Sequence, residues 1–272
     1  MWLIVFIKTK KKNLLFKMNS QQRCILFRKK ILYLSQRVSA LHIGGSFSCT
    51  EILDTIFFKL LKKKDIDNFI LSKGHCSVLH YVILNHLEIV SDKQLNSYSK
   101  SHSKFGVHPE VSNKGINAST GSLGHGLAIA AGFAMAKKSK DIYVVLSDGE
   151  LQEGSTWEAV IAIKALKLNN LVIIIDNNNY QSLEKTSVSH PYLYPIEKKF
   201  IEFGWDSKSC NGHDVNVMSN LVKKRNKKKP FCLVAKTVKG FPISFMKNQP
   251  IWHYRSPNKQ ELEKALKELN SK

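Results

Sequence analysis

The fold of this chain is decided by IYVVLSDGE at residues 142–150 and LVIIIDNNNY at residues 171–180. The first five residues of each segment are apolar and mostly β-branched, which is typical of a buried strand in a parallel sheet. The residues between them, 155–168, have the pattern of a helix. Together the three segments predict a β-α-β unit.

Polar side chains follow both predicted strands. Asp148 comes after the first strand and Asn178, thirty positions later, after the second. In open α/β sheets ligands bind at the carboxyl ends of the strands. A carboxylate, an amide oxygen and the backbone carbonyl of Tyr180 are hard oxygen ligands, which suit Mg²⁺ shared with a bound phosphate. We therefore expect Asp148, Asn178 and Tyr180 to hold Mg²⁺, for which Ca²⁺ or Mn²⁺ could substitute.

Helices and strands alternate along the rest of the chain, which predicts an α/β fold of three layers, a mostly parallel sheet with helices on both faces. One large domain is expected over residues 18–272, after a poorly ordered extension at 1–17. Beyond the β-α-β unit the patterns predict helices at 21–41, 50–61, 78–87, 91–98, 126–137, 197–203, 215–223 and 258–269, strands at 68–71 and 231–236, and loops at 42–48, 99–120 and 181–196.

Composition excludes several classes of protein. The five cysteines are scattered without a C-x-x-C pair, which favours a reducing cytoplasm over a zinc site. No apolar stretch is long enough to cross a bilayer. The net charge of +21 includes lysine runs at 10–12, 62–64 and 227–229. Nucleic-acid binding is one interpretation, but solvated faces of a lysine-rich protein are favoured, because the runs are dispersed and lack interleaved aromatics. We expect neither a nucleic-acid nor a membrane partner.

The metal pattern also carries a family resemblance. Asp-Gly followed some thirty residues later by Asn resembles the diphosphate-anchoring motif of thiamine-diphosphate enzymes. The neighbouring words LQEG (151–154), WEA (157–159) and LKLNNL (166–171) are similar to the transketolase family. Ser147 replaces the usual first glycine of the motif. The resemblance covers residues 20–270 and implies the diphosphate domain of the thiamine-diphosphate-binding fold.

The resemblance implies a second cofactor element at the glycine-rich turn of residues 121–126. Alone, such a turn is more often structural. Beside Asp148 and Asn178 it implies contacts of the cofactor with the backbone, because glycine permits close approach. By resemblance, the residues that bind thiamine diphosphate are Gly121, Ser122 and Leu123 of this turn, with Gly149, Glu150 and Asn178.

Four histidines lie in short sequence segments that resemble segments of the transketolase family. They are His42, His75, His108 and His253. Any one of them would more often be structural, but four in loops at predicted strand ends argue for a shared site. The resemblance places His75 and His253 at the diphosphate or the reactive ring, with His253 also catalytic. It places His42 and His108 at the hydroxyls of the transferred end of a ketose. Histidine suits this work because it donates or accepts protons near neutrality.

Two other polar positions allow more than one interpretation. Glu153 is either an exposed carboxylate at a helix start or, by resemblance, part of a subunit-contact network, with little to separate the two. The word GHD at 212–214 is interpreted as a structural turn and helix cap.

The chain contains no candidate for the glutamate that activates the cofactor, which in the transketolase family lies in a second, pyrimidine-binding domain. The resemblance therefore implies the N-terminal subunit of a split transketolase, which is active only with a separate C-terminal subunit, as an α₂β₂ heteromer. It would transfer a two-carbon ketol unit between sugar phosphates in the cytoplasm, with pentose-phosphate exchange as the default. Two alternatives remain open: a subunit of another thiamine-diphosphate enzyme, and a degenerate non-catalytic assembly subunit, for which Ser147 and Ile43 (in place of a family proline) are mild hints.

Overall fold

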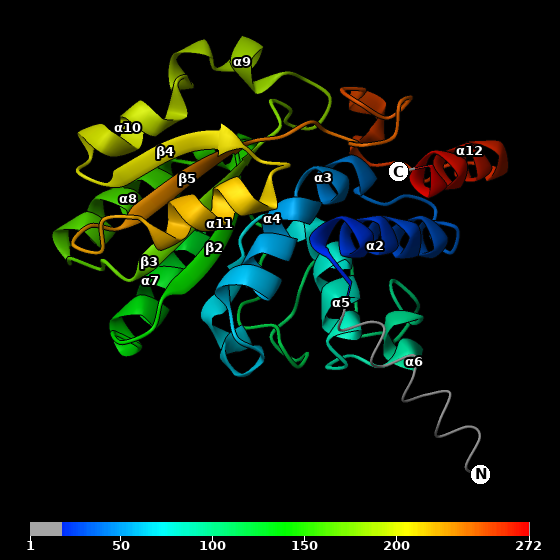
Figure 1. Cartoon of the computed structure of the whole chain (residues 1–272), viewed down its shortest axis with the longest axis horizontal. Helices are drawn as coiled ribbons and strands as arrows, with labels where there is room; N and C mark the ends of the chain where they lie inside the picture. Colours follow the sequence, from blue (N-terminus) through cyan, green and yellow to red (C-terminus); the bar gives the residue numbers. More distant parts are fainter. Residues whose placement is uncertain (1–17, 272) are drawn as a thin grey trace.

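Five parallel strands form one sheet, and the two strands predicted from the β-α-β unit lie at its centre (Figure 1). The computed structural model describes residues 18–271, so the predicted extension at 1–17 lies outside the described residues. The strand order is β1-β2-β3-β5-β4. The strands are β1 (Phe69–Leu71), β2 (Ile142–Ser147), β3 (Leu171–Asn177), β4 (Asp206–Asn211) and β5 (Phe231–Lys236).

Side chains of the central strands alternate between two hydrophobic cores. Val144 and Ile173 belong to one core, whereas Val145 and Ile174 belong to the other, and all four are fully buried. This alternation follows from the period of two residues along a strand. Each such side chain contributes about 1.5–3 kcal/mol of transfer free energy on burial. The sheet is therefore apolar on both faces and needs helices on both.

Helices cover both faces, which confirms the predicted three-layer α/β fold. On one face lie α7 (Gly126–Ala136), α8 (Gly154–Ala165) and α10 (Ile196–Glu202). The helices of the other face are α4 (Thr50–Thr55), its π-helical continuation η1 (Ile56–Leu60), α5 (Ser77–His86) and α11 (Val215–Lys223), with α2 (Ser20–Ser35) and α12 (Lys259–Asn270) further out.

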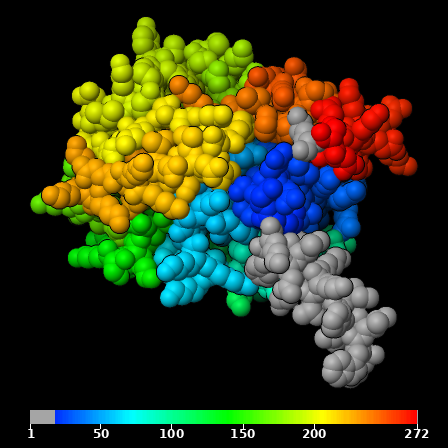
Figure 2. All heavy atoms as spheres, viewed as in Figure 1, coloured from blue at the N-terminus to red at the C-terminus, as the bar shows by residue number. Residues whose placement is uncertain are grey.

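The first and last described helices pack against each other. Lys29 of α2 donates to Asn270 of α12 at 2.6 Å. Figure 2 shows the blue surface of α2 beside the red surface of α12. Both helices begin with a capping box, at Asn19 and Asn258. Asn19 thus fixes the start of α2.

Several segments differ from the sequence-based prediction. The predicted helix 21–41 ends at Ser35, and the predicted helix 91–98 is shortened to Asp92–Leu95. Residues 206–211 form the edge strand β4, which was not predicted, because DSKSCN is polar and an edge strand needs only one apolar face. Residues 43–48, predicted as a loop, form the short helix α3 (Ile43–Ser48). The predicted loop 181–196 contains α9 (Thr186–Ser189) and the 3₁₀ turn η5 (Pro191–Leu193). The remaining short elements are η2 (Lys63–Asn68), η3 (Gly74–Cys76), α6 (Asp92–Leu95), η4 (Gly149–Gln152) and η6 (Pro250–His253).

Lysines that are dispersed in the sequence converge at the amino-terminal edge of the sheet. The segments before β1, β2, β3 and β5 meet there because these strands are parallel and start in register. Lys140 forms an ion pair with Asp65 at 3.1 Å, and Arg225 forms one with Asp141 at 2.5 Å, which joins three of the segments. The runs at 62–64 and 227–229 thus share this edge, before β1 and β5, with two strands between them. The run at 10–12 lies outside the described residues. The absence of a nucleic-acid partner stays a prediction. Within residues 18–271 no helix is long and apolar enough to cross a bilayer.

Candidate functional site

Asp148 lies at the carboxyl end of β2, as predicted, and is completely buried. Its carboxylate accepts hydrogen bonds from the backbone N–H of Asn179 at 2.7 Å and the hydroxyl of Thr186 at 3.1 Å. Burial, and then the nearby Asp176 carboxylate, raise the pKa of Asp148 to about 7. A bound cation would oppose both effects and favour the ionised form. The environment of Asp148 therefore fits a metal ligand.

The side chain of Asn178 is held from two sides. Its amide nitrogen donates to the hydroxyl of Ser48 at 3.1 Å and lies 3.5 Å from Asp176 Oδ2. Its Oδ1 accepts from the backbone N–H of Tyr180 at 3.0 Å. The phenol of Tyr180 in turn donates to the carbonyl of Asn248 at 2.8 Å, which fixes this turn. Donation through nitrogen leaves the amide oxygen as the atom available to a cation.

The proposed metal ligands form a mixed oxygen set. Among residues 18–271 there is no cluster of three or more His, Cys, Asp or Glu side chains suited to a metal. One carboxylate, one amide and one carbonyl, from Asp148, Asn178 and Tyr180, suit Mg²⁺, which usually retains waters and takes oxygens from a phosphate. The residues present thus fit a metal–diphosphate pair better than a metal alone.

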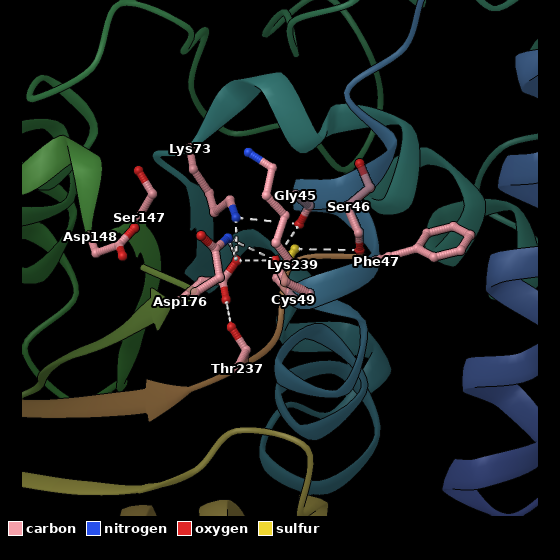
Figure 3. A network of polar contacts seen from close by, with 12 residues as sticks. Gly45, Ser46, Phe47, Cys49, Lys73, Ser147, Asp148, Asp176, Thr237 and Lys239 are labelled. Carbon is pink, nitrogen blue, oxygen red and sulfur yellow. Dashed lines mark hydrogen bonds and ion pairs between the residues drawn. The ribbon is translucent and has the colours of Figure 1, made fainter. Parts of the chain in front are cut away.

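Asp176 is the centre of a buried polar network (Figure 3). It accepts from Lys73 Nζ at 2.5 Å, from the Ser48 hydroxyl at 2.6 Å and from the Thr237 hydroxyl. Lys73 and Asp176 are fully buried. Burial lowers the pKa of Lys73, but Asp176, Cys49 and Cys76 together raise it well above its ordinary value, so Lys73 carries its positive charge at pH 7. This network was not predicted from the sequence, although Lys73 lies beside His75 and Asp176 lies two residues before Asn178.

A cavity of about 350 Å³ brings most of the predicted site residues together. It also contains residues that were not predicted, notably Lys73, Gln152 and Lys239. Ser122, Asp148 and Glu150 are not among its lining residues. The predicted residues that do line it are His42, His75, His108, Gly121, Leu123, Gly149, Asn178, Tyr180 and His253.

Three of the predicted histidines form a cluster around His42. The ring centroid of His42 lies 5.2 Å from that of His75 and 5.1 Å from that of His253. Burial, and then His75, lower the pKa of His42 to about 4. Burial and Lys239 lower the pKa of His253 to about 3, and burial also lowers the pKa of His108. The imidazoles of His42, His108 and His253 are therefore neutral at pH 7 and suit hydrogen bonds to hydroxyl and carbonyl oxygens.

Lys239 is a buried cation that was not predicted from the sequence. Its ammonium lies 3.1 Å from His253 Nδ1 and donates to the carbonyl of Ser182 at 3.1 Å. Burial, and then Lys73, lower its pKa to about 8. Lys239 and Lys73 thus place positive charge at the end of the cavity where Asn178 lies.

The glycine turn forms another part of the cavity wall, through Gly121 and Leu123. Gly121 has φ +148°, and a Cβ there would lie 2.7 Å from Cδ2 of His108. Glu150 accepts from the N–H of Gly124 at 2.9 Å and from the hydroxyl of Ser72, and its Oε2 has no partner among the described residues. Glu150 therefore connects the turn to η4 from behind the cavity, and direct binding of a cofactor by Glu150 stays a prediction.

The segment 212–214 is a structural turn and cap, as predicted. Asp214 Oδ1 accepts from the first turn of α11, at Asn216 and Val217. His213 bridges Glu51 and the backbone of Val238, at 3.0 Å each.

Comparison with known proteins agrees with this geometry. Residues 32–270 match the thiamine diphosphate binding domain of transketolase. The chain belongs to the transketolase family. It is 37% identical over 264 residues to one subunit of the apulose-4-phosphate transketolase of Actinobacillus succinogenes, covering 92% of this chain and 95% of that protein. It is 31% identical over 242 residues to the transketolase of Homo sapiens, covering 85% of this chain but 38% of that protein.

A solved transketolase shares the fold. The enzyme of Campylobacter jejuni superposes with a TM-score of 0.83 at 26% identity, over 93% of this chain and 43% of that one. The predicted family and the thiamine-diphosphate-binding fold are thus confirmed. The chain of this transketolase-family protein spans less than half of the single-chain enzymes it matches.

Proposed function

We propose that this chain is the N-terminal subunit of a split transketolase, which transfers a two-carbon ketol unit from a ketose phosphate to an aldose phosphate in the cytoplasm. The observation that carries the proposal is the single cavity that joins Asn178 at the sheet edge to His42, His75, His108 and His253. The near-complete alignment with a protein that is named as one subunit of a transketolase supports a second, separately encoded chain. That chain would supply the pyrimidine-binding domain, in an α₂β₂ heteromer.

The chain's own residues would hold the charged half of the cofactor. Asp148, Asn178 and the carbonyl of Tyr180 would hold Mg²⁺, and Lys73 and Lys239 would offset diphosphate charge that the metal leaves. Gly149, at the start of η4, lines the same cavity, and its backbone N–H donates to Asp148 Oδ1 at 3.0 Å. Bound thiamine diphosphate supplies the electron sink for carbon–carbon bond cleavage.

The neutral histidines would orient the sugar. Because His42 and His253 have low pKa values, each can donate through one ring nitrogen and accept through the other. His42 lines the cavity, and its Nδ1 has no hydrogen-bond partner among the described residues. His108 lies against the glycine turn on the other side. This arrangement can hold the hydroxyl and carbonyl oxygens of a ketose while protons move between them.

For the donor substrate we propose a class of sugar and not a single compound. The name of the relative from Actinobacillus succinogenes specifies apulose 4-phosphate. We propose ketose phosphates as donors, with xylulose 5-phosphate as the standard probe and apulose 4-phosphate as the second. The phosphate end would be bound largely by the partner chain.

The test measures ketol transfer from each donor to ribose 5-phosphate, with Mg²⁺ and thiamine diphosphate, by this chain alone and with the C-terminal transketolase subunit of the same genome. Activity only in the mixture supports the proposal. Substantial turnover by the purified single chain contradicts it. Cofactor binding without transfer indicates another thiamine-dependent reaction, and no cofactor binding even in the mixture indicates a degenerate subunit.

The metal assignment has its own test. Asp148→Ala should abolish Mg²⁺-dependent binding of thiamine diphosphate by the assembled protein, measured by calorimetry. Asp67→Ala, at an exposed carboxylate on the opposite edge, is the matched control and should leave binding unchanged. Equal affinity of the Asp148 variant and the unaltered protein would rule out Asp148 as a ligand.

A further inference from the structure

A second, larger hollow of about 670 Å³ lies between α8 and the segment 189–203. Its walls are mainly apolar and include Leu151, Trp157, Leu193 and Phe203. The Trp157 ring lies 5.8 Å from that of Phe203, so this wall is built of packed aromatic rings. We call this hollow the α8–α10 groove.

The rim of the α8–α10 groove exposes more apolar surface. Tyr192 is 89% exposed and Val188, beside the groove on α9, is 65% exposed. Ile161 of α8 and Ile201 of α10 are about half exposed. Exposed apolar side chains gathered around a hollow mark interaction surfaces, whereas single ones do not.

The groove is continuous with the cofactor cavity. Gln152 lines both. Its Nε2 is buried and has no hydrogen-bond partner among the described residues.

The segment that forms the outer wall also contacts the proposed metal site. Thr186 donates to Asp148 at 3.1 Å, and the phenol of Tyr194 lies 2.5 Å from the Thr186 hydroxyl. The N–H of Ser187 donates to Asn179 Oδ1 at 2.9 Å. The rim with Tyr192 is therefore anchored to the loop that follows β3, at the mouth of the cofactor cavity.

We propose that the α8–α10 groove is the docking site of the C-terminal transketolase subunit. This inference rests on the proposed function. Gln152 is shared by the cofactor cavity and the groove, so a chain that covers the mouth of the cavity at Gln152 would also reach the apolar groove. The match to human transketolase covers 38% of that enzyme, and the proposed C-terminal chain would correspond to the part that is not matched. The occupant should insert an apolar side chain against Trp157 and place an acidic group near Lys199.

The test compares two double variants that remove the same side-chain types. Val188→Ser with Tyr192→Ser alters the groove rim. Val111→Ser with Tyr33→Ser is the matched control, because these residues are 58% and 55% exposed and do not line the groove. All four positions are exposed, so both variants should fold, which circular dichroism and thermal unfolding check. The dissociation constant for the purified C-terminal subunit is measured by calorimetry.

We expect the groove variant to bind the C-terminal chain at least tenfold more weakly, since exposed aromatic anchors dominate interface energies. The control should change affinity less than threefold. Equal affinities of the two variants overturn the groove as docking site, while heteromer formation and ketol transfer would still support the function. Failure of the unaltered chain to bind the C-terminal subunit overturns both. A groove variant that loses only self-association, with heteromer affinity intact, identifies a second copy as the occupant and also overturns the inference.

Discussion

At the scale of single residues, the orientation of Asn178 depends on Asp176. Asp176 and Ser48 take up the amide nitrogen of Asn178, which leaves the oxygen for a cation. Replacing Asp176 with Asn removes the charge that holds Lys73 in place. Loss of such a partner of a metal ligand typically lowers affinity 10- to 100-fold. We expect Asp176→Asn to weaken Mg²⁺ binding by this factor in calorimetric titrations of the assembled protein with thiamine diphosphate.

Asp206→Asn is the control for this change, because Asp206 begins the edge strand β4 and accepts from the backbone of Asn226, away from the cavity. Mg²⁺ affinity should be unaltered in the control. Equal affinity of both variants would show that Asn178 is oriented without Asp176.

His80 makes stability depend on pH. It is 2% exposed, and neither ring nitrogen has a partner among the described residues. Burial lowers its pKa from 6.5 to about 3. Between these values the unfolded chain binds a proton that the folded chain does not, so stability falls as pH drops below 6.5, by about 1.4 kcal/mol per unit. His80→Leu should reduce the loss of stability between pH 7 and pH 5 by about 2 kcal/mol in urea denaturation.

The exposed residue His125 provides the comparison, and His125→Gln should keep the pH dependence of the unaltered chain. An unchanged slope in His80→Leu would mean that the folded state accommodates the protonated ring.

At the scale of elements, one glycine lies in a crowded position and another in an open one, so replacing each with alanine should change stability in opposite directions. A Cβ at Gly74 would lie 2.7 Å from backbone atoms of Thr120, where η3 meets the glycine turn. A Cβ at Gly132, within α7, would meet nothing within 4 Å. Gly74→Ala should therefore destabilise the chain by about 1–3 kcal/mol, and Gly132→Ala should stabilise it by about 0.5–1 kcal/mol. Chemical denaturation measures both, and shifts of the same sign would contradict the packing at Gly74.

Some secondary-structure elements could be predicted from the sequence, and others could not. The central strands β2 and β3 and the positions of Asp148 and Asn178 follow from apolar runs that only a doubly covered parallel strand explains. The strand β4 could not be found this way, because its burial comes from β5 and α10 and its own residues are polar. The helix α3 contains two glycines and is stabilised by surroundings distant in sequence, with Gly44 packed against Trp252 and Lys239.

The candidate site was predictable to a similar extent. Site residues that lie in family-like sequence motifs, such as His75 and His108, were predicted from the sequence. Lys73, Asp176 and Thr237 were not, because their importance lies in contacts that the fold creates between β3 and two distant loops. The α8–α10 groove was missed for the same reason, since Trp157 and Phe203 are brought together only by packing.

At the scale of the whole molecule, half of the net charge lies far from the proposed chemistry. The segments 61–68, 137–141, 166–170 and 223–230 contain twelve lysines and one arginine against three aspartates, so they contribute +10 of the total +21. They lie at the amino-terminal edge of the sheet, whereas the cavity lies at the carboxyl edge. Strands of about six residues separate the edges by roughly 20 Å, about two Debye lengths at 0.1 M salt. These lysines are therefore too far from the cavity to attract sugar phosphates strongly to it at this salt concentration.

This separation predicts the effect of removing the lysine run at 227–229. Lys227→Ser, Lys228→Ser and Lys229→Ser combined should lower the salt concentration at which the protein leaves a cation exchanger, because these residues are exposed. The same variant should leave the KM of the assembled enzyme for a ketose phosphate within twofold at 0.1 M salt. Lys239→Gln removes only one charge but lies in the cavity, so it should weaken cofactor or substrate binding at any salt concentration. A several-fold rise of KM in the triple variant that disappears at high salt would instead demonstrate steering by the amino-terminal edge.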